Sequence, residues 1–416
     1  MAPNEYGRPP ASSTLTIKPF QAHVDETKLQ HMKDLLSLSP IGISTFENTS
    51  AGRHYGMNRD WLSNAKTHWL SKFDWRAHEA YINSFPNFTA SLADQNGNPL
   101  DVHFVALFSQ KRDAVPIALF HGWPGSFLEF LELLDIARKK WRPEEMPYHF
   151  IVPSLPGFAY SSGPPVETDF GLENVCFVMD KLLVGLGFGS GYLVQGGDIG
   201  SAVCRLLALN YEACKGMHLN MISMPRPENA EQLEVDALEK KALNNGDEFA
   251  NTGYAYAAEH GTRTATIGHA LSSSPLAVLS WVGEKFLEWT DEDPPLDKIL
   301  EGVTLYWLTD TMSRNMYNYR SFNAGKIRPR RAQLANGLFG RTGNKMPPFV
   351  SKPSGYSFFR CDIFPVPKTW AAQTCNLVAY GQHSSGGHFA AMEKPRELLA
   401  DVEEWVAKAW KAQAHL

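Results

Sequence analysis

From residue 115 onward, short apolar runs alternate with stretches in which apolar positions recur every three or four residues. The runs predict buried strands, and the periodic stretches predict helices. Because strands that alternate with helices form parallel sheets covered on both faces, this half of the chain predicts an α/β fold with a mostly parallel sheet. The predicted strands cover residues 115–120, 148–153, 192–195 and 216–222, and the predicted helices between them cover residues 127–138, 172–186 and 201–209.

The first hundred residues follow a different pattern. Asp25 precedes an amphipathic stretch, so we expect it to cap a helix at its N-terminus. Residues 58–83 are rich in aromatic side chains at helical spacing, which favours packing against another part of the chain. Residues 88–93 and 102–108 flank Asn96-Gly97, a pattern typical of a β-hairpin. The face of the first helix that we expect to be buried consists of Leu29, Met32, Leu35 and Leu36.

The alternation stops at Pro225 and resumes late in the chain. Residues 226–325 are periodic at helical spacing, and residues 326–352 are rich in Gly, Pro and Arg, which is typical of a linking segment. Strands are predicted again at residues 356–359 and 376–380, before a final helix that runs through Trp410. A helical block inserted into a parallel sheet is the pattern expected of a lid.

Composition and charge exclude several classes of function. Charged residues make up 20% of the 416 residues and 44% are hydrophobic, which is enough for a large core and argues against extended disorder. The net charge is −5 with both signs interspersed, so no nucleic-acid site is expected. We interpret the densest basic cluster, Arg328-Pro329-Arg330-Arg331, as a solvated connecting loop. Since there is no signal peptide and no run of about 20 apolar residues, we expect a soluble, cytoplasmic protein without membrane contact.

The five cysteines do not indicate a disulfide framework or a metal site. Their number is odd and no C-x-x-C pair occurs, so we expect reduced thiols that are mostly buried. Gly185-Leu186-Gly187-Phe188-Gly189 precedes a predicted strand, whereas a dinucleotide-binding loop follows one. We interpret this segment as a helix-to-strand turn, and we expect neither a cofactor nor a metal. The cysteines are Cys176, Cys204, Cys214, Cys361 and Cys375.

The segment Gly196-Gly197-Asp198-Ile199-Gly200 lies between a predicted strand and a predicted helix. Glycines before and after the central residue allow a sharp turn that projects its side chain, and the N-terminus of the helix favours a carboxylate there. A carboxylate is ionised at neutral pH and can displace a leaving group from saturated carbon to give an ester. We therefore predict that Asp198 is the nucleophile of an α/β-hydrolase-type enzyme acting on an epoxide or an alkyl halide.

A histidine and an acid follow the nucleophile in the chain order of this fold. His388 lies in Gly386-Gly387-His388-Phe389 after the last predicted strand, and we expect it to be the general base. His383 is its rival but lacks the paired glycines. Asp362 is the one Asp or Glu between Gly343 and His388, so a charge-relay acid in this part of the chain must be Asp362.

Opening an epoxide needs an oxyanion site and an acid. Phe120-His121-Gly122-Trp123-Pro124-Gly125 follows an apolar strand, so the backbone N–H groups of Trp123 and Ile199 are expected to form the oxyanion hole. For His121 we favour a role in stabilising the turn. The tyrosines of the helical block are candidate proton donors, and their pattern does not choose among Tyr254, Tyr256, Tyr306, Tyr317 and Tyr319.

Together these motifs resemble the microsomal-type epoxide hydrolase family, in a soluble form that lacks the membrane anchor. The resemblance extends from about Pro19 to Trp410. It rests on Trp69-Leu70-Ser71-Lys72-Phe73-Asp74-Trp75-Arg76, His121-Gly122-Trp123-Pro124, Gly197-Asp198-Ile199-Gly200, Ser273-Ser274-Pro275, Glu284-Lys285 and Gly386-Gly387-His388-Phe389.

The resemblance implies an α/β-hydrolase core, a helical lid and an N-terminal meander that wraps both. We expect the N-terminal region at residues 1–105, the core at 106–225 and 343–416, and the lid with its linking segment at 226–342. The resemblance also implies that Asp198 attacks an oxirane carbon and that His388 with Asp362 activates water. It assigns Tyr256 and Tyr319 as the proton donors, and it suggests a homodimer.

Two other functions remain open from the sequence. A haloalkane dehalogenase also uses an aspartate on this turn, but it stabilises halide with indole or amide N–H donors rather than with paired tyrosines. A catalytically silent receptor with a hydrolase fold is the third possibility, and the complete set of Asp198, Asp362 and His388 argues against it.

Overall fold

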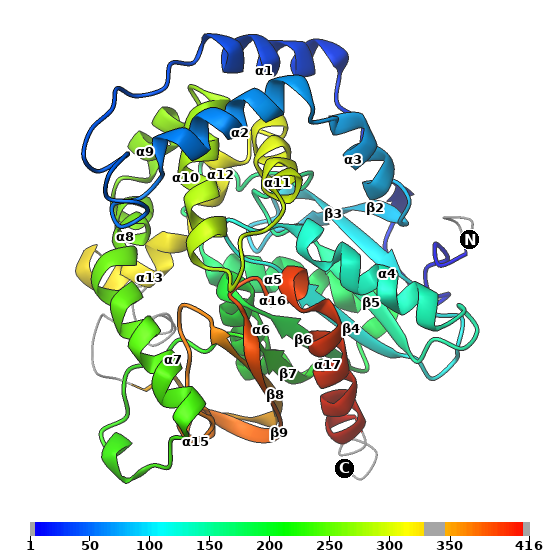
Figure 1. Ribbon diagram of the computed structural model, residues 1–416. Coiled ribbons are helices and arrows are strands. Elements are labelled where there is room, and N and C mark those ends of the chain that lie inside the picture. The colour runs from blue at the N-terminus through cyan, green and yellow to red at the C-terminus, as the bar shows by residue number, and fades with distance from the viewer. Residues whose placement is uncertain (1–4, 328–345, 411–416) are drawn as a thin grey trace.

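A computed structural model describes residues 5–327 and 346–410, and its centre is one twisted β-sheet (Figure 1). Within these residues the sheet has nine strands in the order β1-β2-β3-β5-β4-β6-β7-β8-β9. The strands from β5 to β9 pair in parallel, and β1, β2 and β3 add an antiparallel edge. The strands are β1 Ile17–Pro19, β2 Asn87–Ala93, β3 Pro99–Leu107, β4 Val115–Phe120, β5 Tyr148–Pro153, β6 Tyr192–Gly196, β7 Cys214–Leu219, β8 Val350–Cys361 and β9 Cys375–Gly387.

Helices cover both faces of the parallel strands, as the apolar runs predict. Every residue of β4 and of β6 is buried, which requires cover on each side. Helices α4 and α17 pack together on one face, and α5 and α6 pack together on the other (Figure 1). The α/β architecture predicted from the sequence is therefore confirmed. These helices are α4 Leu131–Lys140, which follows the short 3₁₀ turn η1 Phe127–Phe130, and α5 Leu172–Leu183, α6 Asp198–Asn210 and α17 Pro395–Ala409.

A block of helices between β7 and β8 lies over the sheet (Figure 1). The structure describes no strand in this block as far as residue 327, in agreement with the helical spacing of its sequence. The predicted linking segment and the cluster Arg328-Pro329-Arg330-Arg331 lie largely outside the described residues. The elements of the block are η3 Ala230–Gln232, α7 Ala237–Glu248, η4 Phe249–Gly253, α8 Ala255–Thr262, α9 Thr264–Leu271, α10 Pro275–Glu288, α11 Leu296–Leu308, α12 Met312–Asn315 and α13 Asn318–Ile327.

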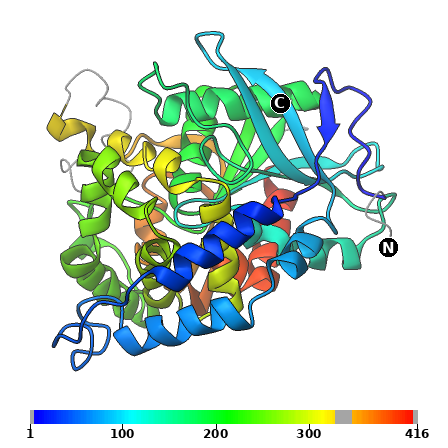
Figure 2. The same ribbon diagram turned by 90° about the horizontal axis from the view of Figure 1, so that it is seen from above.

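Three N-terminal helices wrap around the helical block. Helices α1 Glu26–Leu38 and α2 Arg59–Ser71 lie across α10, and α3 Trp75–Ile82 packs on α11 (Figure 2). Asp25 caps α1 as predicted, because its side chain accepts a hydrogen bond of 2.7 Å from the backbone N–H of Thr27. Leu29, Met32 and Leu36 are buried, but the expectation for Leu35 is wrong: its side chain is 42% exposed, because it lies at the rim of the buried stripe.

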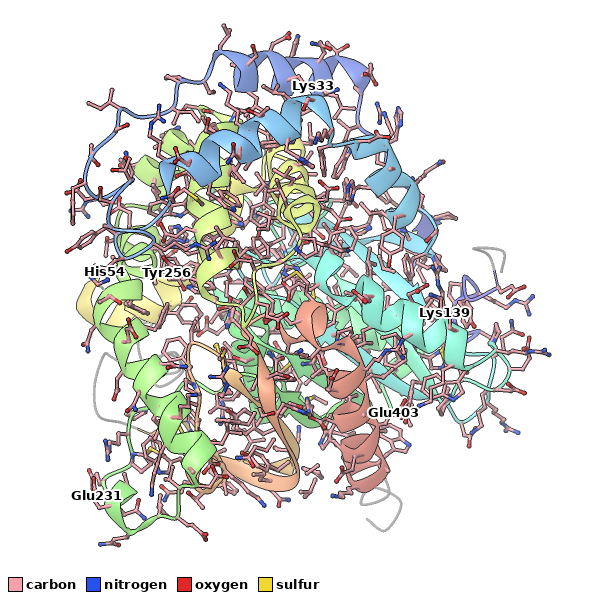
Figure 3. The ribbon with its side chains drawn as sticks, in the orientation of Figure 1. Lys33, His54, Lys139, Glu231, Tyr256 and Glu403 are labelled. Atoms are coloured by element: carbon pink, nitrogen blue, oxygen red, sulfur yellow. The ribbon has the colours of Figure 1, made fainter. Side chains whose placement is uncertain are left out.

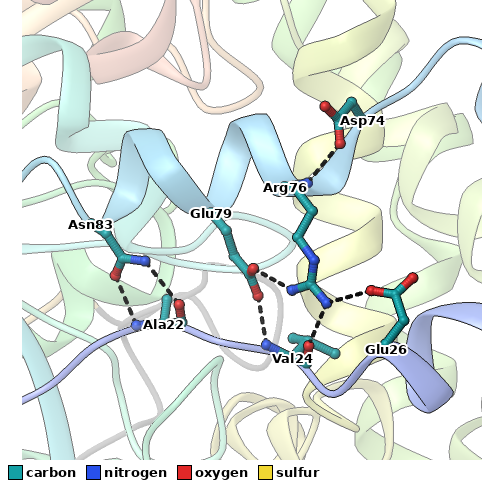
Figure 4. A network of polar contacts seen from close by, with 7 residues as sticks. All are labelled: Ala22, Val24, Glu26, Asp74, Arg76, Glu79 and Asn83. Atoms are coloured by element: carbon teal, nitrogen blue, oxygen red, sulfur yellow. Dashed lines mark hydrogen bonds and ion pairs between the residues drawn. The ribbon is translucent and has the colours of Figure 1, made fainter.

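A polar network fixes the path of the chain into α1 (Figure 4). Arg76 donates to the carboxylates of Glu79 and Glu26 and to the carbonyl of Val24. Glu79 in turn accepts from the N–H of Val24, so one buried carboxylate satisfies both a guanidinium and a backbone donor. Asp74 caps α3 through the N–H of Arg76. The motif that ends in Asp74-Trp75-Arg76 thus joins the N-terminal segment to α3.

Several sequence-based boundaries differ from the structure. Strands β8 and β9 are much longer than the predicted segments 356–359 and 376–380, because pairing between them continues through polar and glycine-rich residues that carry no apolar signal. Helix α5 ends at Leu183, and residues 184–188 form a short π-helical turn, η2, in which Gly187 has φ +98°. This is the helix-to-strand turn expected there.

None of the described helices has both the length and the apolar character needed to cross a membrane.

Candidate active site

Asp198 lies at the turn between β6 and α6, with φ of +45°. This left-handed conformation is uncommon for a residue with a side chain, and aspartate tolerates it better than most. Close packing around this turn requires glycine at two positions, 200 and 122. A Cβ on Gly200 would lie 2.1 Å from the carbonyl oxygen of Phe120, and a Cβ on Gly122 would lie 2.2 Å from Oδ1 of Asp198. The turn therefore forces the carboxylate outward at the end of the central strands.

Both carboxylate oxygens of Asp198 have partners. The backbone N–H of Trp123 donates to Oδ1 at 2.8 Å, and Nε2 of His388 lies 3.4 Å from Oδ2. The side chain is only 11% exposed. It stands at the N-terminus of α6, where the helix dipole favours negative charge. The structure thus places the predicted donor of Trp123 on the carboxylate, while the N–H of Ile199 follows Asp198 at the start of the same helix.

His388 connects Asp198 to Asp362 through its two ring nitrogens. Its Nδ1 lies 2.8 Å from Oδ1 of Asp362, which follows β8, and His388 itself follows β9. Burial lowers the pKa of His388, but hydrogen bonds and charge from Asp198 and Asp362 outweigh burial and raise the pKa to about 10. The N–H of Ile363 donates to the same oxygen of Asp362 and helps to hold it. The three side chains expected to form a triad are therefore adjacent and buried.

The two other candidate histidines have structural partners instead. His383 lies within β9, and its Nε2 is 2.7 Å from Oδ2 of Asp401 on α17, away from Asp198. His121 is buried, and its Nε2 accepts a hydrogen bond of 3.1 Å from the N–H of Leu155. This agrees with the expectation that His121 stabilises the turn. Burial lowers the pKa of His121 to about 4, so its ring is neutral.

The structure separates the five lid tyrosines into two groups. Tyr256 on α8 (Figure 3) and Tyr319 on α13 are buried and meet edge to face, with ring centroids 5.7 Å apart. Both also contact the indole of Trp123, at 5.1 Å and 5.9 Å between centroids. Burial and the nearby charge of Asp198 raise the pKa of Tyr256 well above its usual value, so its phenol remains protonated.

Two of the remaining tyrosines donate hydrogen bonds to backbone carbonyls, and the third is partly exposed to solvent. Tyr317 donates to the carbonyl of Pro156 at 2.8 Å, and Tyr306 donates to the carbonyl of Gly125 at 2.6 Å. Tyr254 is partly exposed at the start of α8. Of the five tyrosines, Tyr256 and Tyr319 thus contact the residue whose backbone N–H binds Asp198.

Comparisons with known proteins agree with this arrangement. Residues 17–130 match the family model "Epoxide hydrolase N terminus", and residues 115–312 match the model "alpha/beta hydrolase fold". A protein of Dothistroma septosporum, named as an inferred epoxide hydrolase, is 46% identical over 408 residues, which cover 96% of this chain and 92% of that protein. The chain belongs to the epoxide hydrolase family.

Two further members of the family extend the comparison. The structure of Aspergillus niger epoxide hydrolase superposes with a TM-score of 0.88 at 44% identity, over 98% of this chain and all of that one. Epoxide hydrolase 1 of Sus scrofa is 28% identical over 96% of this chain and 90% of its own length. The resemblance expected from the motifs is therefore confirmed across nearly the whole chain.

The sequence analysis missed residues that hold the loop of His388 in this epoxide hydrolase. Glu393 accepts hydrogen bonds from the backbone N–H groups of Asp291, Gly387 and Phe389, at 2.9–3.1 Å. The N–H of His388 itself donates to the carbonyl of Trp289 at 2.8 Å. The end of α10 is thus bound to the histidine loop. No motif marks these residues, because the contacts join segments about 100 positions apart.

Glu129 is a second residue that the sequence analysis missed. It lines the cavity that also contains Asp198 and His388. The sequence shows Glu129 as one carboxylate among the apolar residues of η1, Phe-Leu-Glu-Phe. A charged residue near the start of a helix is usually solvated, so this pattern did not single it out.

Proposed function

We propose that this epoxide hydrolase converts epoxides to vicinal diols through a covalent ester on Asp198. The observation that carries the proposal is one carboxylate that contacts a backbone donor and a buried histidine, while the indole of that donor's residue packs on two buried phenols. In the first step Oδ2 of Asp198 attacks an oxirane carbon and the carbon–oxygen bond breaks. Tyr256 and Tyr319 donate a proton to the departing oxygen, since their raised pKa values keep both phenols protonated.

In the second step water attacks the carbonyl carbon of the ester. Esterification removes the negative charge of Asp198, which is one of the two charges that raise the pKa of His388. His388 therefore becomes a better base at the moment when it must take a proton from water. Asp362 holds the ring through Nδ1 and stabilises the imidazolium that forms.

The tetrahedral intermediate is held by the N–H groups of Trp123 and Ile199. The bond from Trp123 to Oδ1 supports this assignment, since Oδ1 becomes the oxyanion. On collapse, the diol oxygen leaves with the proton that His388 took. The other proton of the water stays on the regenerated carboxyl and replaces the one that the tyrosines gave up.

Isotope labelling tests the two-step mechanism. After many turnovers in ¹⁸O-water, mass spectrometry of the peptide that contains Asp198 is expected to find label in its carboxylate. In a single turnover the first diol released is expected to carry unlabelled oxygen from Asp198. Label in the diol with none in Asp198 would contradict the covalent intermediate.

We also propose the division into an N-terminal region at 1–105, a core at 106–225 and 343–416, and a lid with its linking segment at 226–342. The N-terminal helices, the sheet and the block between β7 and β8 support this division. The boundary at 105–106 lies within the buried strand β3, so limited proteolysis is expected to cut first near the boundary at 225–226 instead. First cuts within the parallel strands would contradict the division.

We further propose a homodimer in the cytoplasm. Leu38, Ile43 and Phe46 are 63–83% exposed near the start of the loop between α1 and α2, and a partner subunit would cover them. Light scattering after gel filtration is expected to give twice the chain mass for the wild type and a monomer for Ile43→Asp. Cell fractionation tests the location.

A further inference from the structure

Glu129 is a titratable group in the active-site cavity that the proposed mechanism leaves unused. The cavity is lined by Glu129, Asp198 and His388 together with Asn220 and Phe389. The centre of a water-sized sphere can move within about 10 Å³ of this cavity. That is roughly the space that one buried water molecule requires.

The carboxyl of Glu129 is held against the backbone of the preceding turn. A Cβ on Gly125 would lie 1.3 Å from Oε1 of Glu129, so the carboxyl occupies the space that a side chain at 125 would fill. Tyr306 fixes Gly125 by donating to its carbonyl at 2.6 Å. The position of Glu129 is therefore set by the turn after β4 and by α11 together.

A second cavity begins on the other side of Glu129. It is lined by Gly125, Glu129, Lys298, Glu301 and Gly302 among others, and offers about 30 Å³, which is room for roughly two water molecules. Its rim includes the exposed Glu132 and the partly exposed Lys298. Glu129 lines both cavities, and its side chain is only partly buried.

On the side of Asp198 that faces the lid, packed aromatic rings close the site. The rings of Trp123, Tyr256, Trp289 and Tyr319 contact one another there. The imidazole of His260 and the buried ammonium of Lys285 also pack against these rings, and a bound epoxide would fill what space remains. Packed rings therefore close the lid side of Asp198, whereas the two cavities that Glu129 lines lead toward it from the other side.

We propose that Glu129 positions the hydrolytic water and that the second cavity supplies it. One proton of the water points to Nε2 of His388, and a carboxyl oxygen of Glu129 accepts the other, so that a lone pair faces the ester carbon. The charged and titratable groups that act on Glu129 or line the cavities with it are Asp198, His388, Tyr306, His121, Glu132, Lys298 and Glu301. Burial raises the pKa of Glu129 to about 8, and a protonated carboxyl still accepts through its carbonyl oxygen. Glu129 acts through the water and transfers no proton, so it is a positioning residue.

The inference rests on the proposed covalent mechanism, and rapid-quench mass spectrometry separates the two. Enzyme is mixed with styrene oxide, and the formation and the breakdown of the esterified protein are followed. In Glu129→Ala the breakdown is expected to slow about 10- to 100-fold, since misplaced water loses the advantage of orientation. Formation of the ester is expected to change less than about 3-fold. Glu129→Gln, whose amide oxygen accepts a hydrogen bond, is expected to restore most of the breakdown rate.

A second variant tests the route without changing Glu129. Gly302 lies on α11, and a Cβ there would meet only the ring of Phe286 at 3.6 Å, so Gly302→Met can place its side chain in the second cavity. Its ester is expected to break down more slowly than that of the wild type, with normal formation. An unchanged breakdown rate would overturn the supply route. Equal slowing of both steps in Glu129→Ala, or of neither, would overturn the positioning role, whereas absence of ester in the wild type would overturn the proposed mechanism itself.

Discussion

The phenol ring of Tyr256 lies flat on the indole of Trp123, with centroids 5.1 Å apart and planes 15° apart. The backbone N–H of Trp123 binds Asp198, so one residue contacts both the proposed nucleophile and a proposed proton donor. Trp123→Ala keeps the N–H donor and removes the stack. We expect it to slow ester formation by up to about 10-fold, since a stacked aromatic pair contributes about 0.5–1.5 kcal/mol beyond its buried area.

Trp123→Phe is the matched control. Its smaller ring still packs against Tyr256, so we expect a loss of less than about 3-fold in kcat/KM, within the value of one aromatic pair. Equal losses in the two variants would show that the stack does not position Tyr256.

The tyrosine pair can be tested against Tyr254 and Tyr317, which come just before the same two helices. Tyr256→Phe and Tyr319→Phe each remove one proposed donor to the epoxide oxygen, and we expect kcat/KM to fall about 10²-fold in each, as for loss of a general acid. Tyr254→Phe is expected to retain nearly full activity. Tyr317→Phe is expected to lower the free energy of unfolding by about 1 kcal/mol, because the carbonyl of Pro156 loses its partner, with little change in kcat. Denaturant unfolding and steady-state rates distinguish the four variants.

The orientation of His388 depends on Asp362. In Asp362→Asn the partner of Nδ1 loses its charge, so we expect ester to form and then to accumulate, with kcat reduced about 10³-fold or more. His383→Gln removes the bond to Asp401 and is expected to affect stability while leaving ester breakdown unchanged. Accumulation of ester in His383→Gln instead would reverse the assignment of the base.

Glu393 connects the end of α10 to the histidine loop through three backbone donors. Glu393→Ala leaves these amides without their acceptor, at a cost of about 1–3 kcal/mol for each that stays buried. We expect a lower Tm and slower ester breakdown, because the loop of His388 loses its support. Glu393→Gln keeps one acceptor oxygen for the N–H groups of Asp291 and Gly387, so it is expected to recover most of both losses.

Glu129 also affects how stability depends on pH. Its pKa rises from 4.5 to about 8 on folding, chiefly through burial, so the folded protein binds more protons than the unfolded chain between these values. The stability associated with this group is present below pH 4.5 and is lost as pH rises toward 8, at about 1.4 kcal/mol per pH unit. Glu129→Gln does not titrate, so its Tm is expected to fall less than that of the wild type between pH 5 and 8. Parallel curves for the two proteins would contradict the raised pKa.

Local signals made the strands, the turn of Asp198 and the loop of His388 predictable. Glycine spacing indicates a sharp turn whatever surrounds it. Asp362 could be chosen because no other Asp or Glu lies between Gly343 and His388. The burial of the tyrosines was not predictable from residue types, since Tyr254 lies just before α8 and is partly exposed, whereas Tyr256 lies in its first turn and is buried. Trp289 and Glu393 were not predictable because each binds a residue about 100 positions away, and Glu129 was not predictable because the second cavity that it lines is formed with residues of α11.

Gly125 and Glu129 share one space, and this limits how the turn after β4 can change. A side chain at 125 and a carboxyl at 129 exclude each other at a separation of 1.3 Å. Neither position can therefore be replaced freely while the other is kept. In any variant library built on this fold, we expect substitutions at 125 to survive only when residue 129 is shortened or redirected in the same molecule, so the two sites are inherited as a unit.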